Sequence, residues 1–540
     1  MIISTDGKLS INEERNLYEA LTRRNYFPNQ KETIGELPPC LDTRQFTPEV
    51  CEALVADAGN FTKRKRGYDL VEYKATRYNN VPRSLALVHP LAYAFLAKHI
   101  HDNWDGIKSI QYGNQSIIKP EQRQDGRIMV MNYEAPILQK RRYIKKSFSK
   151  KFCVKSDIAN CFNSIYTHAI AWATIGVKEA KATSTDQSRW YNQLDFHQRN
   201  CKRGETQGIP IGPATSSFMV ELILQKVDQQ LTDKGFSFER YVDDYLFYCE
   251  SYEQAQQVIL ELGQELAVYK LTLNLNKTHV IKLPNTSEDD WVLELQGALP
   301  NRFGKPEGQN QKFSATEAIT FINRAIVVNK VTPDGSVLKY AIQLITPHID
   351  ISASPDVASF VINLSWHYPI LIPFISQLVD NDNESFCAYV EQLNKIIIEN
   401  AKQLRSDGMA WPLHILRNSQ QMPSDDAINE ILKSRDCVSI TILYSMLTDK
   451  SRILEFINPI LEGDDYQKDN YWLLLYQLYF HGELKRNPYQ DGVFVTLKKF
   501  NVNFIPDTSL SEAERECKKI HSNFIREAFI ALDSESKNNL

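Results

Sequence analysis

The chain has 540 residues, with 62 Lys and Arg against 66 Asp and Glu, and its net charge at pH 7 is −4. Hydrophobic residues make up 43% of the sequence and charged residues 24%, which is typical of a globular protein and not of a disordered one. A charge this close to balance excludes a general polycation, so nucleic-acid binding would have to come from local clusters of charge.

The length predicts two or three domains, because one hydrophobic core rarely extends over so many residues. Nine cysteines are scattered without a C-x₂-C pair, which argues against a disulfide framework or a zinc site. No signal-peptide pattern and no apolar run of membrane-spanning length is visible. We therefore expect a cytoplasmic protein that does not enter a membrane.

Two features stand out before residue 105. Residues 63–66 (KRKR) are a short basic cluster that is expected to face solvent. Residues 85–101 (LALVHPLAYAFLAKHIH) predict a helix, with Pro90 near its first turn, where the missing N–H is tolerated.

A longer basic run follows at residues 139–155, and no acidic residue lies between Glu134 and Asp157. Eight uncompensated cations would produce a strong positive field, so phosphate groups of a nucleic acid or a triphosphate are the expected partners. The seven candidate contact residues are Lys140, Arg141, Arg142, Lys145, Lys146, Lys150 and Lys151, and Lys155 completes the run.

Residues 152–283 mix short β-rich runs with helical patterns. FCVKSDI (152–158) and RYVDDYLFYC (240–249) predict strands, and 253–270 has apolar residues at helical spacing. The resulting order is strand, helix, strand-turn-strand, helix, strand, which predicts an α+β palm.

Beyond residue 300 the chain changes character. GKPEGQNQK (304–312) is a polar linker candidate. Strand signals are nearly absent after it, apart from an ambiguous GVFVTL at 492–497. A helical array and an irregular bundle both remain open, because no fixed repeat is found. We expect one domain at 1–300 and an all-α domain at 301–540. The predicted helices are 315–330, 336–347, 355–379, 384–405, 425–447, 451–461, 470–480 and 511–532.

Three acidic residues suit phosphoryl transfer. Asp243 and Asp244 are adjacent within a predicted β-hairpin, whose turn would expose both side chains, and Asp157 ends a predicted strand. Joining a nucleotide to a 3′-hydroxyl needs two divalent ions, and Mg²⁺ prefers carboxylate oxygens. A lone Asp-Asp pair is usually an ordinary turn, so the hypothesis depends on all three residues together.

The residues around these acids resemble four motifs of the reverse transcriptases. Tyr241-Val242-Asp243-Asp244 resembles motif C, and residues 156–165 (SDIANCFNSI) resemble motif A. Residues 207–216 (QGIPIGPATS) resemble motif B, and residues 273–278 (LNLNKT) resemble motif D. The order and the spacing both agree with that family.

The resemblance implies a right-hand polymerase with fingers and palm, acting as an RNA-directed or untemplated DNA polymerase. Two Mg²⁺ ions, with Mn²⁺ as a possible substitute, would be held by Asp157, the carbonyl of Ile158, Asp243 and Asp244. RNA template, dNTPs and a DNA product are the implied partners.

The same resemblance implies nucleotide-binding residues. Phe162 would lie under the sugar and exclude a 2′-hydroxyl, which favours dNTPs over rNTPs. Gln207, Gly208 and Tyr241 would line the nucleotide pocket, with Gly208 permitting a close approach of the backbone. Lys277 could protonate the leaving pyrophosphate as a general acid.

A narrower resemblance is to the bacterial abortive-infection and defence-associated reverse transcriptases, such as the AbiK-like group. It is carried by SIYTHAIAWA (164–173), GIPIGPATSS (208–217) and PRSLALVHPLAY (82–93). That family implies phage defence, a helical HEAT-like C-terminal domain, homo-oligomers and, in some members, a bound non-coding RNA.

Two alternatives stay open, an RNA-dependent RNA polymerase and a non-catalytic RNA-binding protein with a polymerase fold. Phe162 and the YVDD sequence count against the first, and the three intact acids count against the second. His168 could suggest a nuclease or metal site, but no second ligand lies at a suitable spacing, so a packing or hydrogen-bonding role is expected.

Overall fold

The structure is a computed structural model of the chain. The helix predicted at 511–532 and most of the linker candidate at 304–312 lie outside the residues it describes. The described residues are 11–28, 34–58, 64, 66–77, 81–113, 115–121, 126–129, 136–286, 288–300, 312–332, 336–379 and 389–506.

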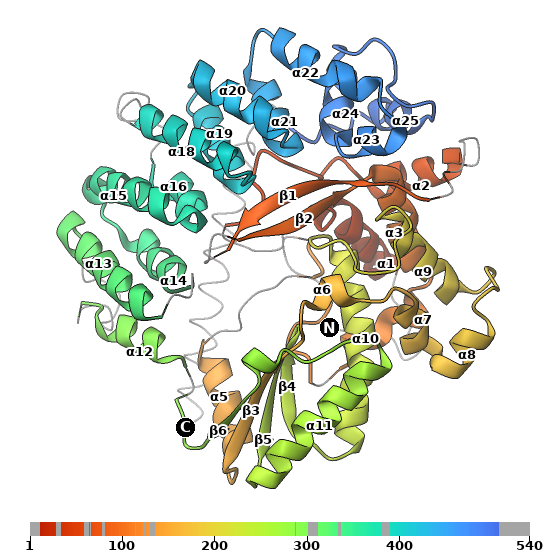
Figure 1. Ribbon diagram of the computed structural model, residues 1–540, viewed down its shortest axis with the longest axis vertical. Coiled ribbons are helices and arrows are strands. Elements are labelled where there is room, and N and C mark those ends of the chain that lie inside the picture. Colours follow the sequence, from red (N-terminus) through yellow and green to blue (C-terminus); the bar gives the residue numbers. More distant parts are fainter. Residues whose placement is uncertain are drawn as a thin grey trace.

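A four-stranded antiparallel sheet forms the centre of the predicted palm (Figure 1). Its strands are β3 (Phe152–Asp157), β4 (Phe238–Tyr241), β5 (Asp244–Cys249) and β6 (His279–Lys282), in the order β4-β5-β3-β6. Both predicted strand segments are therefore confirmed, and the second one is a hairpin that turns between Tyr241 and Asp244.

Helices cover the sheet in the predicted order. α10 (Ala214–Asp233) precedes β4, and α11 (Tyr252–Val268) lies between β5 and β6 and packs on β3 and β5. α11 buries Val258, Leu262 and Leu266, which recur every four residues along one helix face. The shorter helices between β3 and α10 are α6 (Cys161–Ser164), α7 (His168–Ile175), α8 (Val177–Ala182) and α9 (Trp190–Asn200).

The N-terminal region is built on a two-stranded antiparallel hairpin, β1 (Leu70–Thr76) and β2 (Pro82–Val88). The helix predicted at 85–101 is thus wrong at its start, since residues 85–88 belong to β2. Pro90 explains the boundary: a proline disfavours helical geometry in the residue before it but suits the first turn, so α3 (Pro90–Asp102) begins there. The remaining helices here are α1 (Ile11–Glu19), α2 (Pro48–Asp57), α4 (Trp104–Ile107) and α5 (Pro136–Ser147).

From residue 290 the described chain is helical, and the helices follow one another in an arc beside and above the palm (Figure 1). Neighbours along the arc pack together, as α13 does on α14 and α18 on α19. The helices are α12 (Asp290–Gly297), α13 (Ala315–Val331), α14 (Ser336–Ile345), α15 (Ser354–His367), α16 (Ile372–Leu378), α18 (Val390–Lys402), α19 (Asp407–Asn418), α20 (Asp425–Ser434), α21 (Cys437–Met446), α22 (Ser451–Leu461), α23 (Asp465–Asp469), α24 (Trp472–His481) and α25 (Val493–Lys499).

Three details of the helical half differ from the sequence-based expectation. The segment 355–379 is two helices, because a 3₁₀ turn at Pro369–Leu371 separates α15 from α16. The segment 425–447 is two helices, because Arg435 adopts a left-handed conformation (φ 58°) that ends α20, and Asp436 caps α21. The ambiguous segment 492–497 is helical and lies mostly in α25. A HEAT-like repeat and a domain division at residue 300 stay predictions, and α12 already packs on α13 and α14.

The helical half packs against the N-terminal region. α19, α21 and α24 contact β1, and α25 contacts α2. Arg64 lies in this contact, so the expectation that residues 63–66 form a solvated face is wrong for Arg64. Its side chain is 9% exposed and pairs at 2.6 Å with Asp469, a buried carboxylate that would otherwise lack a countercharge. Across the described residues, no helix is long and apolar enough to cross a membrane.

Candidate active site

Antiparallel pairing brings the three predicted acids together. Asp157 is the last residue of β3 and pairs in register with Asp244, the first residue of β5. The N–H of Ile158 donates to the carbonyl of Asp243 over 3.2 Å, so motif A and the hairpin turn are joined through the backbone. Asp157 is 8% exposed, whereas Asp244 lies at the surface.

A buried ion network holds the turn that carries Asp243 and Asp244. The guanidinium of Arg240 is fully buried and donates to both carboxylate oxygens of Glu221, at 2.8 and 3.0 Å. It also donates to Asp228 at 2.7 Å and to the carbonyl of Val242 at 2.7 Å. Val242 has a left-handed φ of 57°, which is unfavourable for a β-branched residue, and the Arg240 bond stabilises it there.

The acids perturb one another. Burial, followed by the charge of Asp157, raises the pKa of Asp243. Desolvation of the Asp244 carboxyl group by the surrounding protein raises the pKa of Asp244 to about 7. The charges of Asp243 and Asp157 are the next largest causes. Like charges at close range disfavour ionisation, so this site favours cations.

Two residues of motif D bond to Asp157. The ammonium of Lys277 lies 2.7 Å from one carboxylate oxygen, and Asn274 donates its amide to the other over 3.0 Å. The hydrogen bond to Asp157 raises the pKa of Lys277, so the side chain carries a proton at neutral pH. Lys277 is therefore placed beside Asp157, while its role stays a prediction.

The donor set fits Mg²⁺ in its chemistry. Carboxylates and a backbone carbonyl are the hard oxygen ligands that this ion prefers. Among the residues that the structure describes, no three His, Cys, Asp or Glu side chains form a ready-made metal site. The cation that Asp157 contacts here is the Lys277 ammonium.

Two of the predicted nucleotide-binding residues, Phe162 and Gln207, lie on neighbouring segments. Phe162, 8% exposed in α6, accepts a hydrogen bond at its carbonyl from the N–H of Ile209 over 3.0 Å. The amide of Gln207 donates to the carbonyls of Asn163 and Ser164, at 3.2 and 3.1 Å. Motif B is thus attached to the helix of motif A, which places Gln207 beside the Phe162 segment.

Gly208 lies where a side chain would crowd the backbone of Asn163 in motif A. Its φ is +78°, and a Cβ atom would stand 3.1 Å from the carbonyl oxygen of Asn163. Tyr241 lies at the end of β4, opposite Asp244, and is half-buried. Both residues therefore lie next to the acids or to motif A, and their contact with a nucleotide stays a prediction.

Arg83 on β2 was not predicted from the sequence, although it lies within electrostatic reach of Asp243 as well as of Glu36. Its guanidinium lies near enough to Asp243 to oppose the rise in the pKa of that carboxyl, and burial lowers the pKa of Arg83 itself. Its Nε is buried without a hydrogen-bond partner among the described residues. A guanidinium so placed can bind an anion such as a phosphate group.

The basic run differs from the prediction. Acids distant in the sequence neutralise five of its eight cations: Arg142 and Lys146 pair with Glu239, Lys140 with Glu288, Lys150 with Glu250 and Lys155 with Asp289. The run is therefore not an uncompensated cluster. Arg141, Lys145 and Lys151 are exposed and make no ion pair within the described residues.

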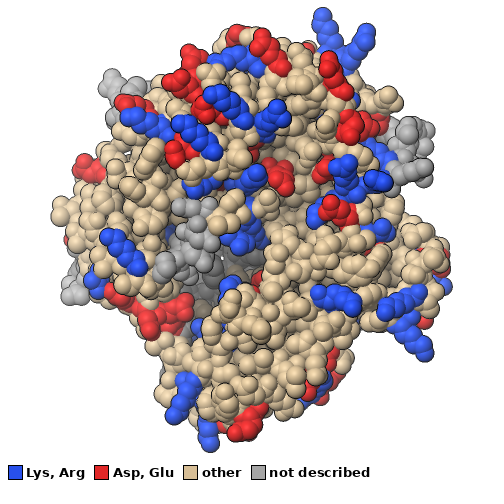
Figure 2. Space-filling view, viewed as in Figure 1, with Lys and Arg blue, Asp and Glu red and all other residues tan. Residues whose placement is uncertain are grey.

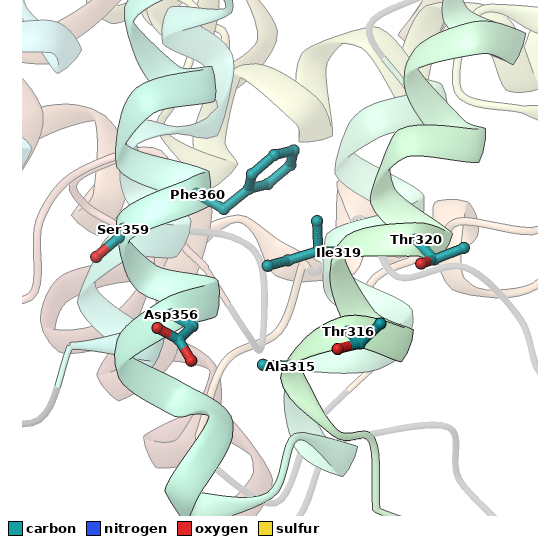
Figure 3. Close-up of a pocket in the computed structure, with 7 residues that line it drawn as sticks. All are labelled: Ala315, Thr316, Ile319, Thr320, Asp356, Ser359 and Phe360. Atoms are coloured by element: carbon teal, nitrogen blue, oxygen red, sulfur yellow. The ribbon is translucent and has the colours of Figure 1, made fainter.

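Two further features lie outside this chemistry. The Nδ1 of His168 donates a 2.7 Å hydrogen bond to a carboxylate oxygen of Asp195, in agreement with a hydrogen-bonding role. An open groove between α13 and α15 is lined by Ile319, Phe360 and Asp356, with Ile319 and Phe360 pointing into it (Figure 3). The groove belongs to the helical half and contains none of the predicted site residues.

Some of the missed residues had a signal in the sequence. Glu221 and Asp228 lie seven residues apart on one face of a largely apolar helix, and Arg240 lies between aromatic residues in a strand pattern. Buried charges of this kind require partners, so their pairing could have been inferred. Arg83 has no comparable local signal.

Comparison with known proteins adds the family. Residues 95–313 match the family described as reverse transcriptase (RNA-dependent DNA polymerase). No curated protein sequence matches the chain significantly.

Among solved structures, the chain is similar to a telomerase from Candida tropicalis truncated from its C-terminal domain, with 12% identity and a TM-score of 0.29. The similarity covers 46% of this chain and 57% of that one, so the chain spans little more than half of that relative. A further structure of apo telomerase from that species has 10% identity and a TM-score of 0.30. The similarity covers 76% of this chain and 74% of that one. Telomerase from Candida albicans in complex with the TWJ fragment of telomeric RNA has 11% identity and a TM-score of 0.27. The similarity covers 78% of this chain and 71% of that one. Such low TM-scores do not establish a shared overall fold.

All four predicted motifs, from Asp157 to Lys277, lie within the matched residues. Residues 95–313, about two fifths of the chain, therefore resemble the domain of reverse transcriptases, which are RNA-dependent DNA polymerases.

Proposed function

We propose that the protein is a DNA polymerase that adds dNTPs to a growing strand, directed by RNA or without a template. The observation that supports this most is the convergence of Asp157, Asp243 and Asp244 at the end of β3 and the start of β5, within the residues that match reverse transcriptases. Two Mg²⁺ ions, held by these acids and the carbonyl of Ile158, would supply the charge that activates the 3′-hydroxyl and stabilises the leaving pyrophosphate.

The protein groups around the acids have complementary roles. Phe162 lies beneath the sugar and excludes a 2′-hydroxyl, while Gln207 and Tyr241 border the same pocket. Arg83 binds a phosphate group of the triphosphate. Lys277, which holds its proton at neutral pH, donates it to the leaving pyrophosphate.

Nucleic acid binds along the outer face of α5. Arg141 and Lys145 are exposed there beside Ile144 and Phe148, which are 66% and 81% exposed. Cations together with an aromatic ring suit a single strand, because phosphates meet the cations and a base can stack on the ring. Figure 2 shows that, on the face of the molecule turned to the viewer, Lys and Arg side chains lie around a hollow near the centre.

The biological setting is proposed from the sequence resemblance to abortive-infection reverse transcriptases. In that setting the protein acts in the bacterial cytoplasm against phage, as a homo-oligomer, with a template or non-coding RNA bound. The helical half organises the polymerase and carries out no separate reaction. Its contacts with β1 and α2 support that part of the proposal.

The test is incorporation of labelled nucleotides by the full chain and by Asp157→Asn and Asp243→Asn, with Mg²⁺. A poly(A) template with an oligo(dT) primer, and dNTPs alone, separate templated from untemplated synthesis. Loss of incorporation in both variants, with unchanged thermal unfolding, is expected. Asp289→Asn, whose side chain is 60% exposed, is the matched control and should retain activity.

Full activity of Asp157→Asn/Asp243→Asn would refute the polymerase assignment. Preferential use of rNTPs by the wild type would favour an RNA polymerase, and RNA binding without any incorporation would favour a non-catalytic protein. Phage plaque counts on cells that produce these same variants test the role in defence.

A further inference from the structure

The hairpin β1–β2 is bonded along both outer edges to distant parts of the chain. On the β1 side, the N–H of Lys74 donates to the hydroxyl of Ser406 over 2.8 Å, and the N–H of Ser406 donates to the carbonyl of Lys74 over 3.0 Å. On the β2 side, the N–H of Ala86 donates to the carbonyl of Ile211 over 2.8 Å. The hairpin thus connects the start of α19 to the motif B segment.

The carboxylate of Asp407 accepts several hydrogen bonds in this contact. It is 5% exposed and accepts from the N–H of Thr76 at 2.7 Å and from the hydroxyl of Thr76 at 2.8 Å. The N–H of Gly408 donates to it at 2.9 Å. Asp436, the N-cap of α21, accepts from the hydroxyl of Ser406. Several donors on one buried carboxylate fix the end of β1 relative to two helices.

The fixed end of β1 lies next to Arg83. Thr76 pairs with Pro82, and the adjacent pair in the ladder is Ala75 with Arg83. Arg83 in turn lies within electrostatic reach of Asp243. A displacement at Thr76 would therefore move the guanidinium relative to the candidate metal ligands.

The other edge of the hairpin leads to the same pocket. Ile211 follows Gly208 and Ile209, whose N–H groups donate to the carbonyls of Ile165 and Phe162 at 2.8 and 3.0 Å. A continuous set of hydrogen bonds therefore extends from α19 through both strands to the segment that contains the proposed sugar gate.

We propose that Ser406 and Asp407 are positioning residues for the nucleotide pocket of the polymerase. By fixing the end of β1, they hold Arg83 beside the acids, where it meets the phosphates of the incoming nucleotide. The inference rests on the proposed polymerase function and gives the helical half an indirect part in nucleotide binding, through the position of Arg83. Since the proposed role of Arg83 is to bind phosphates of the incoming nucleotide, loosening the hairpin weakens nucleotide binding more than it slows the reaction.

Steady-state kinetics of the full chain test this. Asp407→Asn keeps the volume but replaces one acceptor oxygen by an amide, and Thr76→Val removes only the hydroxyl donor. Each should raise the KM for dNTP by about tenfold, with kcat changed less than about threefold. Asp425→Asn in α20, whose side chain is 88% exposed, is the matched control and should leave both constants unchanged.

A double-mutant cycle with Arg83→Ala separates positioning from general destabilisation. If Asp407 acts through Arg83, Asp407→Asn should add less than about twofold to the loss in kcat/KM caused by Arg83→Ala. Full additivity, or an unchanged KM in Asp407→Asn, would overturn the inference. Should Asp407→Asn fail to fold, Thr76→Val supplies the same cycle.

Binding of a dNTP in the presence of Ca²⁺, measured by calorimetry, distinguishes the two levels of failure. Wild-type protein that binds and incorporates dNTPs, together with normal binding by Asp407→Asn, contradicts the positioning role alone. Wild-type protein that neither binds nor incorporates them contradicts the polymerase proposal, and the positioning role fails with it.

Discussion

Arg240 donates a hydrogen bond to the carbonyl oxygen of Val242, two residues along the chain, over 2.7 Å. The same guanidinium is fully buried between Glu221 and Asp228, and Tyr245, next to Asp244, donates its hydroxyl to Asp228 over 2.9 Å. The turn that presents Asp243 and Asp244 is therefore attached to α10 on both sides, which limits the movement of these acids.

Removal of the buried Arg240 should lower both the free energy of unfolding and nucleotide incorporation, and the two losses should have different causes. Arg240→Met leaves Glu221 and Asp228 buried without a countercharge, so the free energy of unfolding should fall by about 3–5 kcal/mol. Arg240→Met/Glu221→Gln/Asp228→Asn removes all three charges and should recover most of that loss, as measured by denaturant unfolding. Nucleotide incorporation should stay low in both, since the Val242 carbonyl lacks its donor. Recovery of incorporation in the triple variant would show that the network serves only stability.

The sugar selectivity should depend on Phe162. Phe162→Ala removes the ring proposed to clash with a 2′-hydroxyl, so the ratio of rNTP to dNTP incorporation should rise by an order of magnitude or more, as about 1.4 kcal/mol of discrimination corresponds to tenfold. Competition between labelled dNTPs and rNTPs gives the ratio. Phe196→Ala, at a ring that is 38% exposed in α9, is the control. An identical ratio in Phe162→Ala and wild type would exclude the gate.

The ion pairs within the basic run predict unequal contributions to nucleic-acid binding. Arg141→Gln/Lys145→Gln should weaken binding and reduce the slope of log Kd against log salt by about 0.7–0.9 for each phosphate that the variant no longer neutralises. Lys395→Gln/Lys433→Gln removes two exposed cations from the helical half and serves as the control. Fluorescence anisotropy with a labelled single strand at several salt concentrations measures the slope. Equal slopes in the two variants would place the nucleic acid elsewhere.

The contact between the hairpin and α19 should depend on pH. Burial raises the pKa of Asp407 to about 6, above the value of about 3.9 expected in the unfolded chain. A raised pKa in the folded state means that the folded protein binds the proton more tightly. The stability from this group is thus fully present below pH ~4 and is lost as pH rises through ~6, by an amount on the order of 3 kcal/mol.

Thermal unfolding of wild type and Asp407→Asn between pH 4 and 7 measures this effect. The advantage of the wild type should shrink as the pH rises. Asp469, whose pKa is also raised to about 6 chiefly by burial, titrates in both proteins, so their difference isolates Asp407. A difference that is constant with pH would contradict the prediction.

The sequence predicts most of the palm because its signals are local. Alternating apolar residues indicate the strands, and the adjacent acids Asp243 and Asp244 between two such runs indicate the turn. These are the parts of the fold and the site that the sequence determines over short distances.

The remaining errors come from partners far apart in the chain. In the sequence the charge of Lys150 has no acidic residue nearby, but in the structure Glu250, 100 residues later, lies beside it. Similarly, the basic cluster around Arg64 suggests a solvated side chain, but in the structure Arg64 forms a buried ion pair with Asp469. Residues 85–88 have enough apolar character for either a helix or a strand, and the pairing with β1 decides the outcome.

The hairpin β1–β2 has a consequence for truncated proteins. A two-stranded sheet normally leaves two rows of backbone groups able to recruit strands from other molecules. Here Ser406 and Asp407 occupy backbone donors of β1 at Lys74 and Thr76, and Ile211 occupies one of β2. A chain ending before α19 would uncover the β1 row beside the apolar surface left by α21 and α24, so it should self-associate through sheet extension. Aggregation of such a fragment would therefore say nothing about the chemistry of its carboxylates.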